Sequence, residues 1–162
     1  MKRIIILLLA LLPLVAGAQD ITVNHDSHDI IYKTIIESEA SYDDMLKYLL
    51  AYDILDNIVM HGNMIAGDLT PEQIDYASAG YTRMKVPLYL SNGYFTCRVI
   101  FRFKEGRYMI EAMNMRFYDG GMGGTTSKLY DGYDAFAFDI AIDLAIKHID
   151  TKTTFSIPSE DW

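Results

Sequence analysis

Cysteine, proline and basic residues are scarce in this chain, and each scarcity excludes a class of protein. The 162 residues include one cysteine, Cys97, and four prolines. A single cysteine cannot form an internal disulfide or supply a cysteine-rich zinc site. Fourteen Lys and Arg face 22 Asp and Glu, a formal net charge of −8, whereas general nucleic-acid binders carry a basic surface. An apolar content of 51% excludes a wholly disordered chain.

The longest apolar run lies at the N-terminus and has the pattern of a secretory signal peptide. Lys2 and Arg3 precede the apolar run 4–15, and small residues at 16–18 offer a signal-peptidase site. The run is short for a membrane span and has no basic stop-transfer flank. No cysteine lies near the cleavage site, so a lipoprotein is not expected. We predict an exported protein, periplasmic or extracellular, with no transmembrane segment after cleavage.

The remaining chain is the length of one domain. Removing residues 1–18 leaves 144 residues and takes away two basic residues, so the net charge becomes −10. The sequence shows no internal repeat and no change in composition that would mark a second domain. We expect a flexible N-terminal segment at 19–29, a single α+β domain at 30–150 and a polar C-terminal tail at 151–162.

Two periodicities alternate along this domain. Helical spacing, with Ser41 and Asp44 as a capping-box-like pair, predicts a helix at 41–53, and a second helix is predicted at 133–149. The segments on either side of Gly62-Asn63 suggest a small hairpin. Segment 70–73 predicts a turn or a short helix. Extended segments are predicted at 30–36, 83–90, 94–104 and 107–118.

The last three extended segments form an antiparallel meander with one apolar face. On 94–104 this face carries every second residue: Phe95, Cys97, Val99, Phe101 and Phe103. Such a face needs a cover, and the two helices are the only candidates. The predicted fold is therefore α+β, an antiparallel sheet with two helices packed on one face, in the order β-α-β(4)-α.

Two stretches resemble a known family. Residues 30–50 combine a strand with a Ser-capped helix, and residues 94–118 carry Phe103-Lys104-Glu105-Gly106-Arg107-Tyr108 at a hairpin turn. They resemble the secreted, Bacteroidota-type domain of unknown function that has a TATA-binding-protein-like (TBP-like) fold. The match covers most of residues 25–150. The family has no established activity, so the resemblance implies a fold and no functional residue, and a shared fold does not imply DNA binding.

Residues capable of chemistry have simpler explanations. The His25–Asp29 segment contains elements of a triad or a metal site, but triads are assembled in space, and we interpret it as a solvated tail. His61 fits a turn, and a partly positive His148 fits the C-terminal end of a helix. Cys97 lies among aromatic residues, which favours a buried thiol.

The glycines at 120–124 lack the Gly-Lys-Ser/Thr ending of a phosphate loop, and the nearby aspartates lack the spacing of a calcium loop. We predict no catalytic residue, metal ion or cofactor.

Charge is unevenly distributed along the chain. Segment 83–116 has seven basic and two acidic residues, a net of +5, whereas the rest of the exported chain has a net of −15. Strand alternation places five of them on the sheet side opposite the apolar face, together with Met115: Arg83, Lys85, Arg98, Arg102 and Arg107. The candidate binding residues there are Lys85, Tyr89, Arg98, Ile100, Arg102, Met109, Glu111 and Met113.

This pattern supports several interpretations. The first is a non-catalytic binding or interaction module that contacts an acidic protein or another anionic partner of the cell envelope. The second is an envelope hydrolase in which His61, His148 and several aspartates meet in one pocket. The third is a self-associating structural protein, a homo-oligomer. An ordinary solvated sheet face, with Arg stems over apolar neighbours and Glu111 paired across strands, explains the same pattern without a partner.

Overall fold

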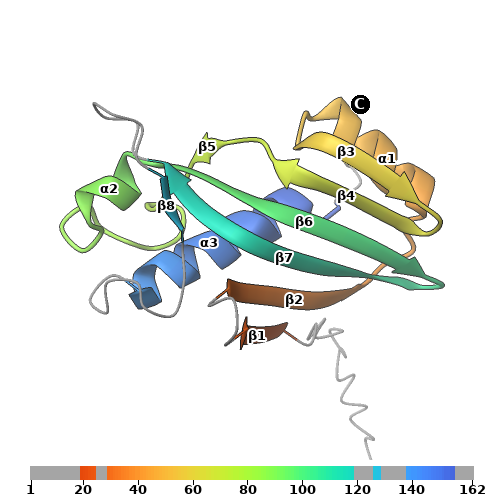
Figure 1. Ribbon diagram of the computed structural model, residues 1–162, viewed down its shortest axis with the longest axis horizontal. Coiled ribbons are helices and arrows are strands. Elements are labelled where there is room, and N and C mark those ends of the chain that lie inside the picture. Colours follow the sequence, from red (N-terminus) through yellow and green to blue (C-terminus); the bar gives the residue numbers. More distant parts are fainter. Residues whose placement is uncertain (1–18, 25–28, 119–125, 129–137, 156–162) are drawn as a thin grey trace, which may run out of the picture.

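A single antiparallel sheet organises the described part of the chain. The computed structural model describes residues 19–24, 29–118, 126–128 and 138–155, and these form one eight-stranded sheet with three helices. The main strand order is β1-β2-β7-β6-β4-β3, with β5 beside β6 and β8 beside β7. The strands are β1 Gln19–Asn24, β2 Asp29–Glu37, β3 Leu55–His61, β4 Met64–Leu69, β5 Glu72–Gln73, β6 Tyr94–Lys104, β7 Arg107–Tyr118 and β8 Thr126–Lys128; the helices are α1 Tyr42–Ala51, α2 Leu88–Ser91 and α3 Phe138–Thr153 (Figure 1).

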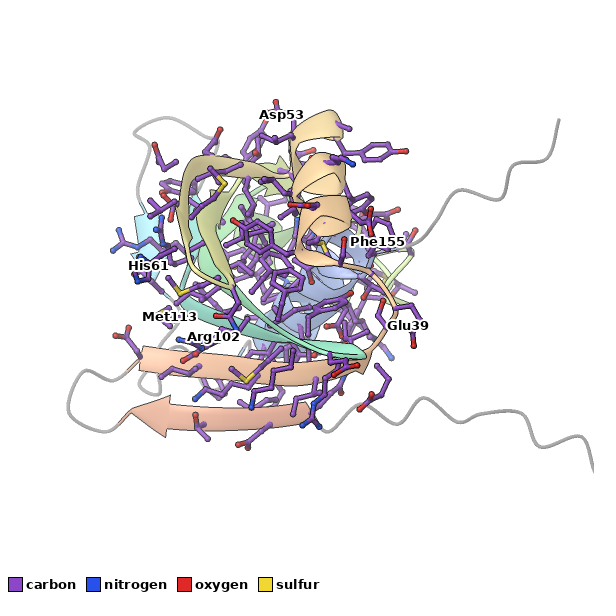
Figure 2. The ribbon with its side chains drawn as sticks, turned by 90° about the vertical axis from the view of Figure 1, so that its right-hand side faces the viewer. Glu39, Asp53, His61, Arg102, Met113 and Phe155 are labelled. Carbon is purple, nitrogen blue, oxygen red and sulfur yellow. The ribbon has the colours of Figure 1, made fainter. Side chains whose placement is uncertain are left out.

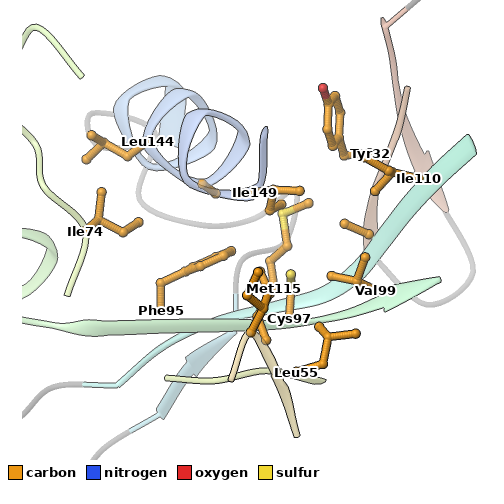
Figure 3. Packing of buried hydrophobic residues seen from close by; sticks show 14 of the residues in the cluster. Tyr32, Leu55, Ile74, Phe95, Cys97, Val99, Ile110, Met115, Leu144 and Ile149 are labelled. Atoms are coloured by element: carbon orange, nitrogen blue, oxygen red, sulfur yellow. The ribbon is translucent and has the colours of Figure 1, made fainter. Parts of the chain in front are cut away.

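The two longer helices cover one side of this sheet. Phe95, Cys97, Val99, Phe101 and Phe103 of β6 are all buried beneath them, as the alternation in the sequence predicts. Figure 3 shows this layer, where side chains of the sheet meet Leu144 and Ile149 of α3. The predicted α+β fold with two helices on one face is confirmed, and β2, α1, β3, β4, β6, β7 and α3 supply its β-α-β4-α order.

The start of α1 follows from local sequence. Ser41 Oγ accepts a hydrogen bond from Asp44 N at 3.2 Å, and Asp44 Oδ2 accepts one from Ser41 N at 3.1 Å. This reciprocal capping box satisfies two backbone donors that have no partner within the helix. The helix ends at Ala51, and Asp53 takes a left-handed φ of 52° as the chain turns toward β3.

Segment 83–90 is not a strand, and this prediction is wrong. Residues 83–86 form turns, and α2 begins at Leu88 with Pro87 as its N-cap. Proline has no N–H for a strand ladder, whereas it fits the start of a helix. The Pro87 carbonyl accepts hydrogen bonds from Leu90 N and Ser91 N. The neighbour of β6 on this side is instead β4, from the predicted hairpin around Gly62.

The two ends of the domain also differ from expectation. Gln19–Asn24, expected to be flexible, forms β1 and pairs along β2. The last helix extends beyond 149 into the expected tail and ends at Thr153, whose carbonyl accepts from Tyr108 Oη. Segment 70–73 contributes the short strand β5 to the sheet. The predicted signal peptide, residues 25–28, 133–137 and 156–162, and the glycines at 120–124 lie outside the described residues.

Candidate functional site

Strand pairing brings six of the eight candidate residues together on the sheet side opposite α1 and α3, called here the open face. Across β6 and β7, Arg98 lies opposite Met113, Ile100 opposite Glu111, and Arg102 opposite Met109. Figure 2 shows Arg102 and Met113 on this side, away from the helices. The described residues include no helix over this face (Figure 1).

Lys85 and Tyr89 do not belong to the open face. Lys85 lies exposed in a turn, and Tyr89 lies in α2, where its side chain is outside the described part. Strand alternation placed both residues, so the absence of a strand at 83–90 removes the basis for that placement.

Glu111 is the most buried charged group of the open face. It forms ion pairs with Arg102 and, at 3.5 Å, with Lys33 of β2, and only 12% of its side chain is exposed. Burial raises the pKa of Glu111, but the Arg102 hydrogen bond and the nearby Lys33 charge outweigh it, so the pKa lies below its ordinary value. The cross-strand pairing of Glu111 expected for an ordinary sheet face is therefore present.

Arg98 has an intramolecular partner as well. Its Nη1 donates to Asp68 Oδ1 on β4 at 3.1 Å, and Asp68 Oδ2 accepts from Asn57 Nδ2 of β3 at 3.0 Å. The open face thus combines cations and carboxylates from strands that are distant in sequence. Register assigns to it the cations Lys33, Arg98, Arg102, Lys104, Arg107 and Arg116 and the carboxylates Asp20, Asp29, Glu37, Asp56, Asp68 and Glu111. The excess positive charge of segment 83–116 is therefore largely balanced in space.

Two β-bulges interrupt the strand register near Asp56 and Arg98. The register shifts between Asp56 and Val59 on β3 and between Thr96 and Arg98 on β6. Asn57 (φ 51°) and Asn114 of β7 (φ 55°), which lie beside these shifts, take left-handed backbone conformations. Asparagine adopts this conformation more readily than most residues with a side chain.

The bulge at Asn114 corrects one prediction. Met115, expected on the open face, is 1% exposed and lies in the core near Cys97 (Figure 3). An extra residue in one strand reverses the side on which the following residues lie. Arg116 consequently joins the open face, where it pairs with Thr96.

A cleft of about 350 Å³ lies between the two bulges. We call it the bulge pocket; its polar lining residues are Asp56, Asn57, Asp68, Thr96, Arg98, Asn114, Arg116 and Tyr118. Arg116 Nε donates to Asn114 Oδ1 at 3.1 Å, and Thr96 Oγ1 donates to the Leu69 carbonyl. The pocket therefore offers guanidinium, amide and carboxylate groups for recognising a polar ligand.

A second cleft, of about 500 Å³, lies on the helix side between α3 and segment 72–79. His148, 9% exposed, lines it with its ring edge-on to Phe95. Burial, followed by the charge of Lys152, lowers the pKa of His148. The prediction of a partly positive His148 at a helix end is therefore wrong, because α3 continues to Thr153 and the His148 ring packs against Phe95 of β6.

The two histidines of the hydrolase interpretation do not converge. His61 is paired with Met64 in the β3–β4 hairpin, on the open-face side (Figure 2), whereas His148 contacts the core. Within the described ranges, no three His, Cys, Asp or Glu side chains are grouped closely enough to hold a metal ion. His25 and His28 lie outside those ranges, as do Asp119, Asp131 and Asp134.

Cys97 is a core residue, as predicted. It is 2% exposed, and burial, reinforced by the charge of Asp68, raises the pKa of its thiol well above the ordinary value. A buried neutral thiol is a poor nucleophile.

Sequence reasoning missed several residues of the open face, among them Lys33, Asn57, Asp68, Asn114 and Arg116. Lys33 and Asp68 come from strands whose pairing with the β6–β7 hairpin is long-range. For Asn114 a signal was present, because a lone asparagine within a strand of Met and aromatic residues is a candidate for a bulge.

Comparisons with known proteins add a likeness of fold. No family model matches the chain, and no curated protein matches it. Among solved structures, the chain is similar to a TBP-like protein from Parabacteroides distasonis, with 12% sequence identity and a TM-score of 0.49, covering 80% of this chain and 91% of that one. A likeness at this level assigns no function. Within the described residues, none of the helices has the length and apolar character that a membrane crossing requires.

Proposed function

We propose that this chain is an exported, non-catalytic binding module of the cell envelope that receives an acidic protein or another anionic partner on its open face. The observation that carries the proposal is a sheet face on which half-buried apolar side chains alternate with arginines, with no described helix over it. Arginine and methionine are enriched at protein interfaces, and each can bury a long stem while it contacts a partner.

The apolar part of the face is continuous across the two central strands. Ile100 of β6 and Met109 and Met113 of β7 are each partly exposed, and cross-strand pairing sets them beside Arg98, Arg102 and Glu111. A partner that covers these side chains removes apolar surface from water, at about 25 cal/mol per Å².

The charge available to a partner lies mainly at the two ends of the face. Within the described part of the chain, no carboxylate lies within ion-pair distance of Arg107, near the β6–β7 turn, or of Arg116, in the bulge pocket. Arg98 and Arg102 already have carboxylate partners. Arg107 and Arg116 therefore form the cationic contacts of the proposed interface.

Binding of a hexaglutamate peptide to ¹⁵N-labelled protein, followed by amide chemical shifts, tests this assignment. We expect saturable shifts along β6 and β7, weakened by Arg107→Glu combined with Arg116→Glu. A matched control is Lys47→Glu with Lys152→Glu, which makes the same charge change on α1 and α3, away from the open face. Shifts confined to the helix side, or equal weakening by both pairs, would refute the assignment.

A second candidate function is self-association, because the edge strand β3 exposes apolar side chains. Val59 and Met60 are 52% and 56% exposed on a strand whose outer edge has no neighbour among the described strands. Exposed edges can pair with another copy of a chain. Light scattering over a hundred-fold concentration range tests this candidate; a monomer mass at every concentration excludes it.

A further inference from the structure

We propose that the bulge pocket is a carboxylate site in which Arg116 and Arg98 together hold one acidic side chain of the partner. This inference rests on the proposed function and gives the recognition chemistry at one end of the open face. It follows from how the two bulges orient these arginines.

Arg116 is aimed by its neighbour on the same strand. Its Nε donates to Asn114 Oδ1 at 3.1 Å, and the left-handed backbone of Asn114 (φ 55°) produces the bulge that turns Arg116 to the open face. Because Nε is engaged, the two terminal nitrogens of the guanidinium remain as donors. A guanidinium with free Nη groups matches the two oxygens of a carboxylate.

Arg98 lies diagonally across from Arg116 on β6, since Thr96 is the residue directly opposite Arg116. Both arginines line the bulge pocket, so their long side chains can converge on one anion there. Only Nη1 of Arg98 is used by Asp68, at 3.1 Å. The remaining Arg98 donors are free to contact a ligand beside Arg116.

Two carboxylates also line the pocket, and neither is paired with Arg116. Asp68 has both oxygens engaged, one by Arg98 and the other by Asn57 at 3.0 Å. Asp56 is on β3, three strands from Arg116 in the order β7-β6-β4-β3. Arg116 has no carboxylate partner among the described residues, so an anion bound to its free Nη groups would balance its charge.

Titration of the full ¹⁵N-labelled protein with glutarate tests the site, with uncharged glutaramide as the isosteric probe and inorganic phosphate as the competing anion. We expect glutarate to shift the amide signals of Thr96, Asn114 and Arg116 saturably. Arg116→Gln should weaken this binding about ten-fold or more, the loss of one charge-assisted pair of hydrogen bonds. Lys47→Gln, which removes the same charge from α1 on the helix side, should leave binding within two-fold.

Asn114→Gly separates orientation from folding. Glycine keeps the positive φ without strain but removes the Oδ1 acceptor, so glutarate binding should weaken while the unfolding midpoint changes little. An unchanged glutarate affinity in this variant overturns the orienting role of Asn114.

Different results overturn the carboxylate site and the proposed function of the open face. No saturable shift with glutarate, equal effects of glutaramide, equal weakening by Lys47→Gln, or tighter binding of phosphate each overturns the carboxylate site. If hexaglutamate still maps to β6 and β7, the proposed function survives that result. If glutarate binds in the pocket but hexaglutamate does not map to the open face, the pocket is correct and the proposed function is wrong.

Discussion

Met115→Ala tests the most consequential local feature of the sheet, the bulge that reverses the order of side chains on β7. The sequence alternation assigns Met113 and Met115 to the same face. The structure separates them: Met115 is 1% exposed in the core beside Cys97, whereas Met113 is partly exposed on the open face opposite Arg98.

The expected magnitudes follow from this difference in burial. Truncating a fully buried methionine removes its transfer free energy and leaves a cavity, a loss of about 2–5 kcal/mol in the free energy of unfolding. Truncating Met113 removes apolar surface that is already partly hydrated, and the expected loss is roughly 0.5–1 kcal/mol. The two variants delete the same atoms, so intrinsic differences between methionine and alanine cancel.

Urea unfolding followed by circular dichroism measures both values. With an m-value of about 2 kcal/mol per molar urea, Met115→Ala should lower the midpoint by roughly 1–2.5 M and Met113→Ala by no more than about 0.5 M. Equal shifts for the two variants, or a larger shift for Met113→Ala, would contradict the bulge. The m-values should agree within error, because a changed m-value indicates a changed denatured state and invalidates the comparison.

Three further predictions concern ionisation and export. The pKa of Glu111 is held below its ordinary value. Its pairing therefore stabilises the fold above the unfolded pKa of about 4.3, and this stabilisation is lost as pH falls through the folded pKa. In urea titrations, the stability difference between the native chain and Glu111→Gln should shrink as pH falls below about 4.3, and a constant difference would exclude this linkage. Cys97, buried with a raised pKa, should react with a thiol reagent only after denaturant is added, and rapid labelling of the native protein would show that the core is open. Export should yield a chain that begins at Gln19, and intact mass spectrometry of envelope and medium fractions checks this; a chain retaining residues 1–18 would rule out cleavage there.

Much of the fold could be predicted because its information is local. The capping box of α1 needs only Ser41 and Asp44, and the buried face of β6 follows from strict alternation over eleven residues. Pro87 also carried a local signal against a strand, and the alternation of apolar residues around it was misleading. Alternation alone does not distinguish a strand from turns followed by a short helix.

The candidate site was less predictable because its partners are distant in sequence. Lys33 meets Glu111 through β2–β7 pairing, and Asp68 meets Arg98 through β4–β6 pairing. Counting charges along segment 83–116 therefore overestimated the positive charge of the open face, since carboxylates from other strands enter it.

The sequence by itself determined the α+β class, the helix start at Ser41 and the buried side of β6, because these depend on side-chain period and capping within one segment. Only the tertiary structure decided which charges remain available to a partner and where Arg116 points. Those properties depend on strand order and on a one-residue bulge at Asn114, and neither is encoded in the period of any single strand.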